Sequence, residues 1–325
     1  MVKLNAKTAG TLALDDFVRV IPNIYYKHDQ KRSIWDVWLH ANHHASGIGE
    51  EVRKNKPGGK ILVEVADFAM WLFTFVEKLQ GTMGEEKAGD QREDESLIRV
   101  TMGYSDLLWF KYPGMCPVCY WRRTDGGNRK KEKNKNFEDS CDCLLHNVES
   151  RDQKEKEKHV KSLRAYAKEI INRKPATVDD WQVMFGKIYE ANLRHLDLND
   201  IAFHLLEEMG EVSDAIVRIY TYSGSKPLIS GEPRWRQTWL EEEIADVSSW
   251  LFALIEKLDF IRETADEYDK WRYKEEIFAD RTQILLSQII WRRYGSDERG
   301  GFYCPHCGET ECNCKIRFIG RRDLS

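Results

Sequence analysis

Much of the second half of the 325-residue chain repeats the first half. Glu64–Leu79 reads EVADFAMWLFTFVEKL, and 179 positions later Glu243–Leu258 reads EIADVSSWLFALIEKL. Three further matches keep the same order: Asp15–Tyr25 with Asp179–Tyr189, His43–Glu50 with His204–Glu211, and Trp109–Tyr112 with Trp291–Tyr294. Because four matches in one order are hard to obtain by chance, the sequence predicts two copies of one unit.

Both copies are expected to be helical. Around Glu243 the apolar residues recur at helical spacing, at Leu240, Ile244, Val247, Leu251, Leu254, Ile255 and Leu258. The chain is 42% apolar, which is ample for a core. No apolar run approaches the roughly 18–20 residues of a membrane span, and the N-terminus lacks the layout of a signal peptide. We therefore expect an all-α fold, a cytoplasmic location and no membrane partner.

The order of motifs predicts five segments. A helical repeat is expected at 14–112, a zinc knuckle with a polar loop at 113–148 and a charged linker helix at 149–176. The second helical repeat is expected at 177–295 and a second zinc knuckle at 296–325. Thr177, followed three residues later by Asp180, is typical of a helix N-terminus.

All eight cysteines fall in two compact groups. The groups are Cys116, Cys119, Cys141 and Cys143, and then Cys304, Cys307, Cys312 and Cys314. Each begins with C-P-x-C, a spacing that puts two sulfurs on one ion, so each group predicts a structural Zn²⁺ site with all four positions filled. A redox dithiol, an iron–sulfur cluster or one unevenly shared zinc are the alternatives. Nucleic acid is not an expected partner, because the net charge is −4.

Paired carboxylates interrupt two otherwise apolar helices. Glu243 and Asp246 are the only charges from Glu243 to Ile255, and Glu208 and Glu211 show the same three-residue spacing. Residues three apart share a helix face, and buried carboxylates are costly unless compensated. Oxygen ligands without His or Cys favour Mg²⁺ or Mn²⁺ over zinc. Salt bridges to a neighbouring helix are the alternative for either pair.

The full pattern is Glu207-Glu208-x-x-Glu211, 31 residues, then Glu243-x-x-Asp246. It resembles the signature of the all-α nucleoside triphosphate pyrophosphohydrolases, the superfamily of MazG, dimeric dUTPases and dCTP pyrophosphatases. The resemblance covers residues 178–295 well and 14–112 weakly. It implies hydrolysis of a nucleoside triphosphate to the monophosphate and pyrophosphate. It also implies metal ligation by Glu208, Glu211, Glu243 and Asp246, and an accessory, water-orienting or merely surface role for Glu207.

The first copy departs from this pattern. Aligned on Gly49-Glu50, it retains Glu50, Glu64 and Asp67, but Gly47 stands opposite Glu208. We therefore expect a degenerate site with a structural task. In this superfamily a second subunit or a second repeat often completes the active site, so a homo-oligomer is also compatible with the sequence.

Polar, cationic and aromatic residues before and between the two carboxylate motifs of the second half are candidates for substrate contacts. They are His195, Asn199, Arg218, Lys226, Arg234, Trp235 and Arg236. The alternative for each is an ordinary solvated position. The alternative for the whole chain is a nucleotide-sensing or scaffold protein with little or no turnover.

Overall fold

The computed structural model describes residues 4–54, 59–81, 100, 102–124, 153–222, 233–264 and 283–314. Regular structure in these residues is almost entirely helical, which confirms the expected all-α class. None of the helices in this described part combines the length and apolar character needed to cross a membrane. In chain order the elements are α1 (Ala6–Ala9), α2 (Leu14–Val20), η1 (Pro22–Tyr25), α3 (Tyr26–Asp29), α4 (Ile34–Arg53), α5 (Gly59–Leu79), α6 (Tyr104–Lys111), α7 (Pro117–Thr124), α8 (Gln153–Glu169), η4 (Ile171–Arg173), α9 (Val178–His195), α10 (Leu198–Tyr222), α11 (Pro233–Thr264), α14 (Leu286–Tyr294), β1 (Gly295–Ser296) and β2 (Gly301–Phe302).

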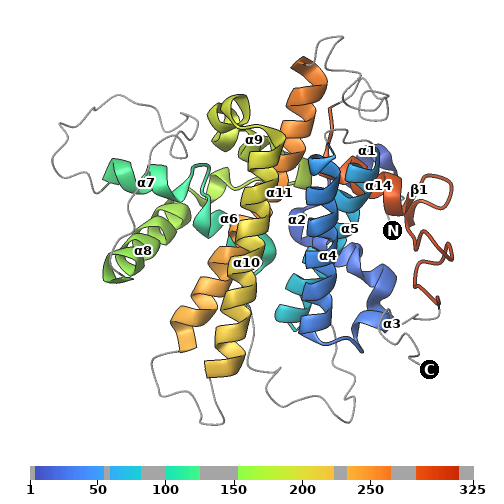
Figure 1. The fold of residues 1–325 in the computed structure, drawn as a ribbon, viewed down its shortest axis with the longest axis horizontal. Coiled ribbons are helices and arrows are strands. Elements are labelled where there is room, and N and C mark those ends of the chain that lie inside the picture. The colour runs from blue at the N-terminus through green and yellow to red at the C-terminus, as the bar shows by residue number, and fades with distance from the viewer. Residues whose placement is uncertain are drawn as a thin grey trace.

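Two pairs of long helices form the centre of the molecule. Helix α4 packs against α5, α10 packs against α11, and the two pairs meet where α10 packs against α4 (Figure 1). Helix α5 is buried on most of its surface, which its nearly continuous apolar sequence requires. In the part of the chain that the structure describes, the two strands β1 and β2 form a short antiparallel pair just before the C-terminal cysteine group.

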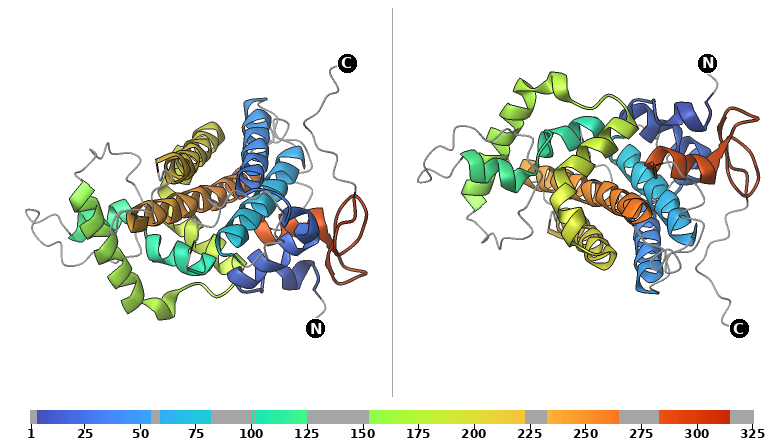
Figure 2. Two further views of the ribbon diagram at one scale, coloured as in Figure 1. Left: turned by 90° about the horizontal axis from the view of Figure 1, so that it is seen from below. Right: turned by 90° about the horizontal axis from the view of Figure 1, so that it is seen from above.

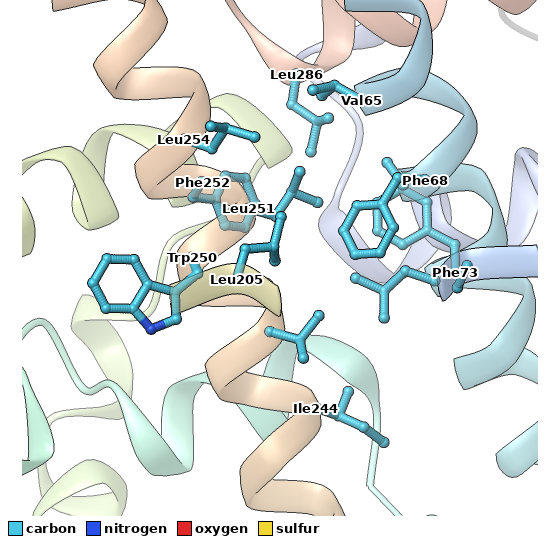
Figure 3. Close-up of a cluster of buried hydrophobic side chains, with 14 of the residues drawn as sticks. Val65, Phe68, Phe73, Leu205, Ile244, Trp250, Leu251, Phe252, Leu254 and Leu286 are labelled. Atoms are coloured by element: carbon cyan, nitrogen blue, oxygen red, sulfur yellow. The ribbon is translucent and has the colours of Figure 1, made fainter. Parts of the chain in front are cut away.

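The two halves share one hydrophobic core. In Figure 3, Phe68 and Phe73 of α5 face Leu251 and Ile244 of α11. These four side chains are at most 1% exposed. Burying a side chain of this size stabilises a fold by about 1.5–3 kcal/mol. The long-helix pairs are therefore held together by apolar contact between the first and second halves, not only within each.

The helix at the W-x-x-Y motif of each half packs against the opposite half. Helix α6 lies on α11, and α14 lies on α5 (Figure 2). Near the starts of α2 and α9, an antiparallel bridge joins Ala13 to Thr177, and the Val178 N–H donates to the Leu12 carbonyl at 3.1 Å. Because α6 packs on α11, its C-terminal end, with Lys111, lies beside the second half.

Helix starts follow the local sequence. The Thr177 hydroxyl accepts from the Asp180 N–H at 3.2 Å, and the Asp180 carboxylate accepts from the Thr177 N–H at 3.1 Å. Two otherwise unpaired N–H groups are thereby satisfied, which confirms the predicted N-terminus of α9. Ser33 and Asp36 form the same capping box at the start of α4.

Candidate functional site

Three acidic side chains from two helices converge in the second half. Glu208 and Glu211 lie on one face of α10, and Glu243 lies on the adjoining face of α11. Each offers an oxygen, and these oxygens lie within 4.8 Å of one another. Glu243 is buried and Glu211 is exposed, so the cluster opens to solvent on one side. The structure thus brings together three of the four residues expected to hold a divalent cation.

The fourth residue, Asp246, is held by the first half of the chain. Its carboxylate accepts hydrogen bonds from the Lys111 ammonium and the Tyr112 hydroxyl. The ammonium also donates to the Glu242 carbonyl at 3.1 Å, and the Ser249 hydroxyl donates to Tyr112 at 3.2 Å. Lys111 and Tyr112 were missed as site residues by the sequence reasoning. The available signal was the repeated W-x-x-Y motif, which also contains Lys111.

The cluster perturbs the acidity of its members. Burial, reinforced by the charge on Asp246, raises the pKa of Glu208 to about 9. Burial, with added repulsion from Asp246 and Glu211, raises the pKa of Glu243 to about 8. Burial opposes the charge on Lys111, but Asp246 and the neighbouring glutamates outweigh it and raise the pKa of this ammonium. Without a further cation, the protein therefore holds extra protons at Glu208 and Glu243 near neutral pH.

These shifts predict how stability depends on pH. In the unfolded chain both carboxyls ionise near their ordinary pKa of 4.5, whereas in the fold they keep protons up to about pH 8–9. Between these limits the folded state binds more protons, so its stability falls as pH rises. We expect the melting temperature in magnesium-free buffer to fall by about several degrees between pH 6 and 9.

The measurement is a thermal melt at stepped pH, without a chelator so that the cysteine sites stay undisturbed. Glu208→Gln and Glu243→Gln should each flatten the slope, because each removes one titrating group. Equal slopes in the wild type and both variants would show that Glu208 and Glu243 do not keep their protons in the folded protein.

Glu207 points away from the other carboxylates. Its side chain is 63% exposed and lies 3.3 Å from His204 Nδ1. The His204 ring stacks on Trp250 with centroids 4.5 Å apart, and Tyr189 stacks on the same indole at 5.1 Å. Glu207 therefore lies at the rim of the site rather than among the clustered oxygens.

The other expected substrate residues are spread over α9, α10 and α11. His195 ends α9, and Asn199 lies nine residues before Glu208, about 14 Å along α10. Arg218 pairs with Asp214 at 2.8 Å, and its guanidinium lies 5.4 Å from the Trp239 ring centroid. The first turn of α11 contains Arg234, Trp235 and Arg236, and Lys226 lies outside the described residues.

The corresponding place in the first half has a different composition. Glu64 lies 2.8 Å from His44 Nδ1, whereas Glu50 is 54% exposed and pairs with Lys54 at 2.7 Å. A Cβ atom on Gly47 would lie 2.7 Å from the Glu64 carboxyl, so Gly47, not Glu50, faces Glu64. The structure thus brings together Glu64 and His44 rather than Glu64 and Glu50.

Asp67 is neutralised from the second half. Arg293 donates two hydrogen bonds to its carboxylate, at 2.8 and 3.0 Å, and the Tyr294 hydroxyl donates a third. A planar guanidinium held by two bonds is a rigid partner for a carboxylate. All three retained acids of the first half, Glu50, Glu64 and Asp67, are therefore paired within the protein.

The C-terminal cysteines form a compact group. Sulfur atoms of Cys304, Cys307, Cys312 and Cys314 lie within 4.8 Å of one another. Gly308 turns the chain with a φ of 71°, and the Cys312 N–H donates to the Ile24 carbonyl at 2.6 Å. The group could hold a metal ion, and its backbone is tied to the first half. Cys116, just before α7, and Cys119, in its first turn, are both buried. Cys141 and Cys143 lie outside the described residues.

Comparisons with known proteins return no match among protein-family models, curated proteins or solved structures. Any functional assignment must therefore be argued from the residues and geometry of this chain.

Proposed function

We propose that the chain is a Mg²⁺- or Mn²⁺-dependent nucleoside triphosphate pyrophosphohydrolase of the MazG-like, all-α kind, active in its second half. The observation that carries the proposal is the convergence of Glu208, Glu211 and Glu243 within 4.8 Å. Three carboxyl groups this close together are poorly suited to a purely structural role, because their burial and mutual repulsion destabilise the fold unless a ligand compensates them. It is well suited to a ligand that arrives as a divalent cation with a polyphosphate.

The donor set fits such a cation. Glu208, Glu211 and Glu243 would hold it, with Asp246, one helical turn beyond Glu243, as the fourth carboxylate. The raised pKa values of Glu208 and Glu243 fit the same reading, because a nearby cation would restore their charged forms. When bound, the ion supplies a Lewis acid for phosphate oxygens and lowers the pKa of an attacking water molecule.

Residues of this chain supply the rest of the site. Lys111 presents a positive charge between Asp246 and the Glu242 carbonyl, where it can attract the polyphosphate and keep it oriented. Tyr112 fixes the Asp246 carboxylate from the opposite side. Glu207, exposed at the rim, is retained as an accessory carboxylate that can orient or deprotonate water. The site is then composite, with acids from the second half and a cation from the first.

Matched contacts support the proposed duplication. Ala13 and Thr177, which form the antiparallel bridge, are 164 positions apart in the sequence. His40 and His204 are separated by the same 164 positions. His40 stacks on Trp71 at 4.3 Å, much as His204 stacks on Trp250 at 4.5 Å. This offset is three residues longer than the one used to align the carboxylate motif from sequence.

With the 164-position offset, His44 replaces Glu208 and Gly47 replaces Glu211. The first half then has no acid at the positions on α4 that correspond to Glu208 and Glu211. Glu64 has a histidine partner instead of a carboxylate partner. We accordingly propose that the first half is a catalytically silent copy that contributes Lys111 and Tyr112. The cysteine groups are proposed to hold one structural Zn²⁺ each.

A composite site predicts a large effect of Lys111→Ala. Turnover should fall by roughly 10- to 100-fold, the range found when supporting residues of a metal site are removed. Melting temperature should also drop, because Asp246 loses its cationic partner. Arg293→Ala is the matched control: it removes the cation beside Asp67 and should cost stability but little turnover. Similar turnover in the two variants would contradict a catalytic contribution from Lys111.

The proposal is tested by incubating the protein with Mg²⁺ and a panel of ribo- and deoxyribonucleoside triphosphates. Chromatography measures the triphosphate that remains. We expect at least one to be consumed in large excess over protein. The alternative, a nucleotide-sensing or scaffold protein, predicts tight binding of a triphosphate without consumption.

A further inference from the structure

A small pocket lies beside the carboxylate cluster, where α6, α7 and α8 meet α11. Helices α6, α7 and α8 lie on one side of the long-helix pairs in Figure 1. The pocket volume is about 100 Å³. Its lining residues are Met102, Leu107, Phe110, Lys111, Pro117, Tyr120, Leu163, Arg164, Glu241 and Glu242. Most of the wall is therefore apolar or aromatic, and a few charged groups converge on it, which is the usual make-up of a small-molecule site.

The charged part of the wall includes an ion pair. An Arg164 guanidinium nitrogen lies 3.4 Å from a Glu241 carboxylate oxygen, and Glu241 is only 8% exposed. A carboxylate this buried needs a partner that offsets its lost hydration. Apolar residues of similar volume would often stabilise the fold at least as well as such an ion pair. Beside a pocket, however, such a pair offers both hydrogen-bond donors and acceptors. A flat heterocycle with both kinds of group on its edge matches that arrangement.

Lys111 connects the pocket to the carboxylates. Its side chain lines the pocket, while its ammonium contacts Asp246 and donates to the Glu242 carbonyl. Glu242 also lines the pocket and directly precedes Glu243 in α11. A ligand that extends from the pocket past Lys111 therefore runs toward Asp246 and Glu243 on α11.

We infer that this pocket binds the nucleobase of the substrate, with the polyphosphate extending past Lys111 to Glu208, Glu211 and Glu243. The inference rests on the proposed function for the position of the phosphates. Size supports it, because pockets for whole drug-sized ligands measure about 300–1,000 Å³, whereas this one suits a single ring system. The base site then lies between α6, α7, α8 and α11, away from the sequence candidates His195 and Asn199.

Filling the pocket tests the inference. Leu163→Trp places an indole in it, and Leu39→Trp on the exposed face of α4 is the matched control. The first measurement is KM for the hydrolysed nucleoside triphosphate and for inorganic tripolyphosphate, which has no base. Leu163→Trp should raise KM for the nucleotide at least about 10-fold and leave that for tripolyphosphate unchanged. An unchanged nucleotide KM, or an equal rise for both compounds, would overturn the base assignment.

The second measurement does not depend on catalysis. Dissociation constants of AMP, GMP, CMP and UMP are measured by calorimetry for the wild type and Leu163→Trp. At least one should bind the wild type and weaken about 10-fold or more in the variant; binding of none, or binding unaffected, would overturn the inference. Absence of hydrolysis alone would count against the proposed function only. If Leu163→Trp does not fold, Arg164→Gln, at the partly exposed end of the ion pair, is expected to weaken the same monophosphate.

Discussion

Glu243→Gln is expected to reduce nucleotide hydrolysis by roughly two to three orders of magnitude, the range seen when one preorganised electrostatic group is removed from an active site. Glu243 is the buried member of the cluster, and its oxygen faces both Glu208 and Glu211. The amide keeps the shape but removes the charge that a divalent cation requires. Without added metal the variant should melt at a higher temperature than the wild type, because repulsion within the cluster falls.

Glu64→Gln is the matched control for Glu243→Gln. The two glutamates begin the repeated Glu-x-Ala-Asp motif, but the partner of Glu64 is the imidazole of His44 instead of another carboxyl group. Its replacement should change turnover by no more than about threefold, as expected of a residue outside the chemistry. Equal losses in the two variants would mean two coupled sites or one composite site shared by both sets of acids, and the first half would not be silent.

Loss of zinc is expected to have the largest effect on stability. Elemental analysis of protein purified without added metal should give two zinc ions per chain. Structural zinc sites contribute apparent binding energies of about 10–16 kcal/mol in small domains. The C-terminal group also connects to the first half through the Cys312–Ile24 hydrogen bond and through Phe302, which packs against Phe17 with centroids 6.0 Å apart.

Cys304→Ser removes one ligand of this group and should lower the melting temperature by more than about 10 °C. Cys304 is 1% exposed, so the loss should spread into the surrounding packing and lead to aggregation. His306→Ser, a change of a neighbouring residue outside the four sulfurs, is the control and should melt like the wild type. Iron with visible absorbance, or oxidised thiols without metal, would contradict the zinc assignment.

The features predicted well from sequence are those fixed by local interactions. The helical spacing around Glu243 follows from apolar residues that must face one side. The start of α9 follows from Thr177 and Asp180, whose side chains satisfy N–H groups three residues away. Both depend on neighbours within about one helical turn, so they can be deduced without knowing the rest of the fold.

The features missed depend on distant parts of the chain. Lys111 lies 135 positions from Asp246, and Arg293 lies 226 positions from Asp67. Each contact exists only because α6 and α14 pack on the opposite half. The alignment of the first-half carboxylate motif with the second half was equally hard to predict. By residue type, His43–Glu50 matches His204–Glu211, but the residues that face Glu64 depend on how α4 packs on α5. Gly47, rather than Glu50, faces Glu64 for this reason.

The most direct test of the central claim is the identity of the products formed with Mg²⁺ from the preferred nucleoside triphosphate. The composite carboxylate site predicts monophosphate and pyrophosphate in equal amounts, with formation dependent on Mg²⁺ and lost in Glu243→Gln. Diphosphate with orthophosphate, or product formation that persists in Glu243→Gln, would contradict the account.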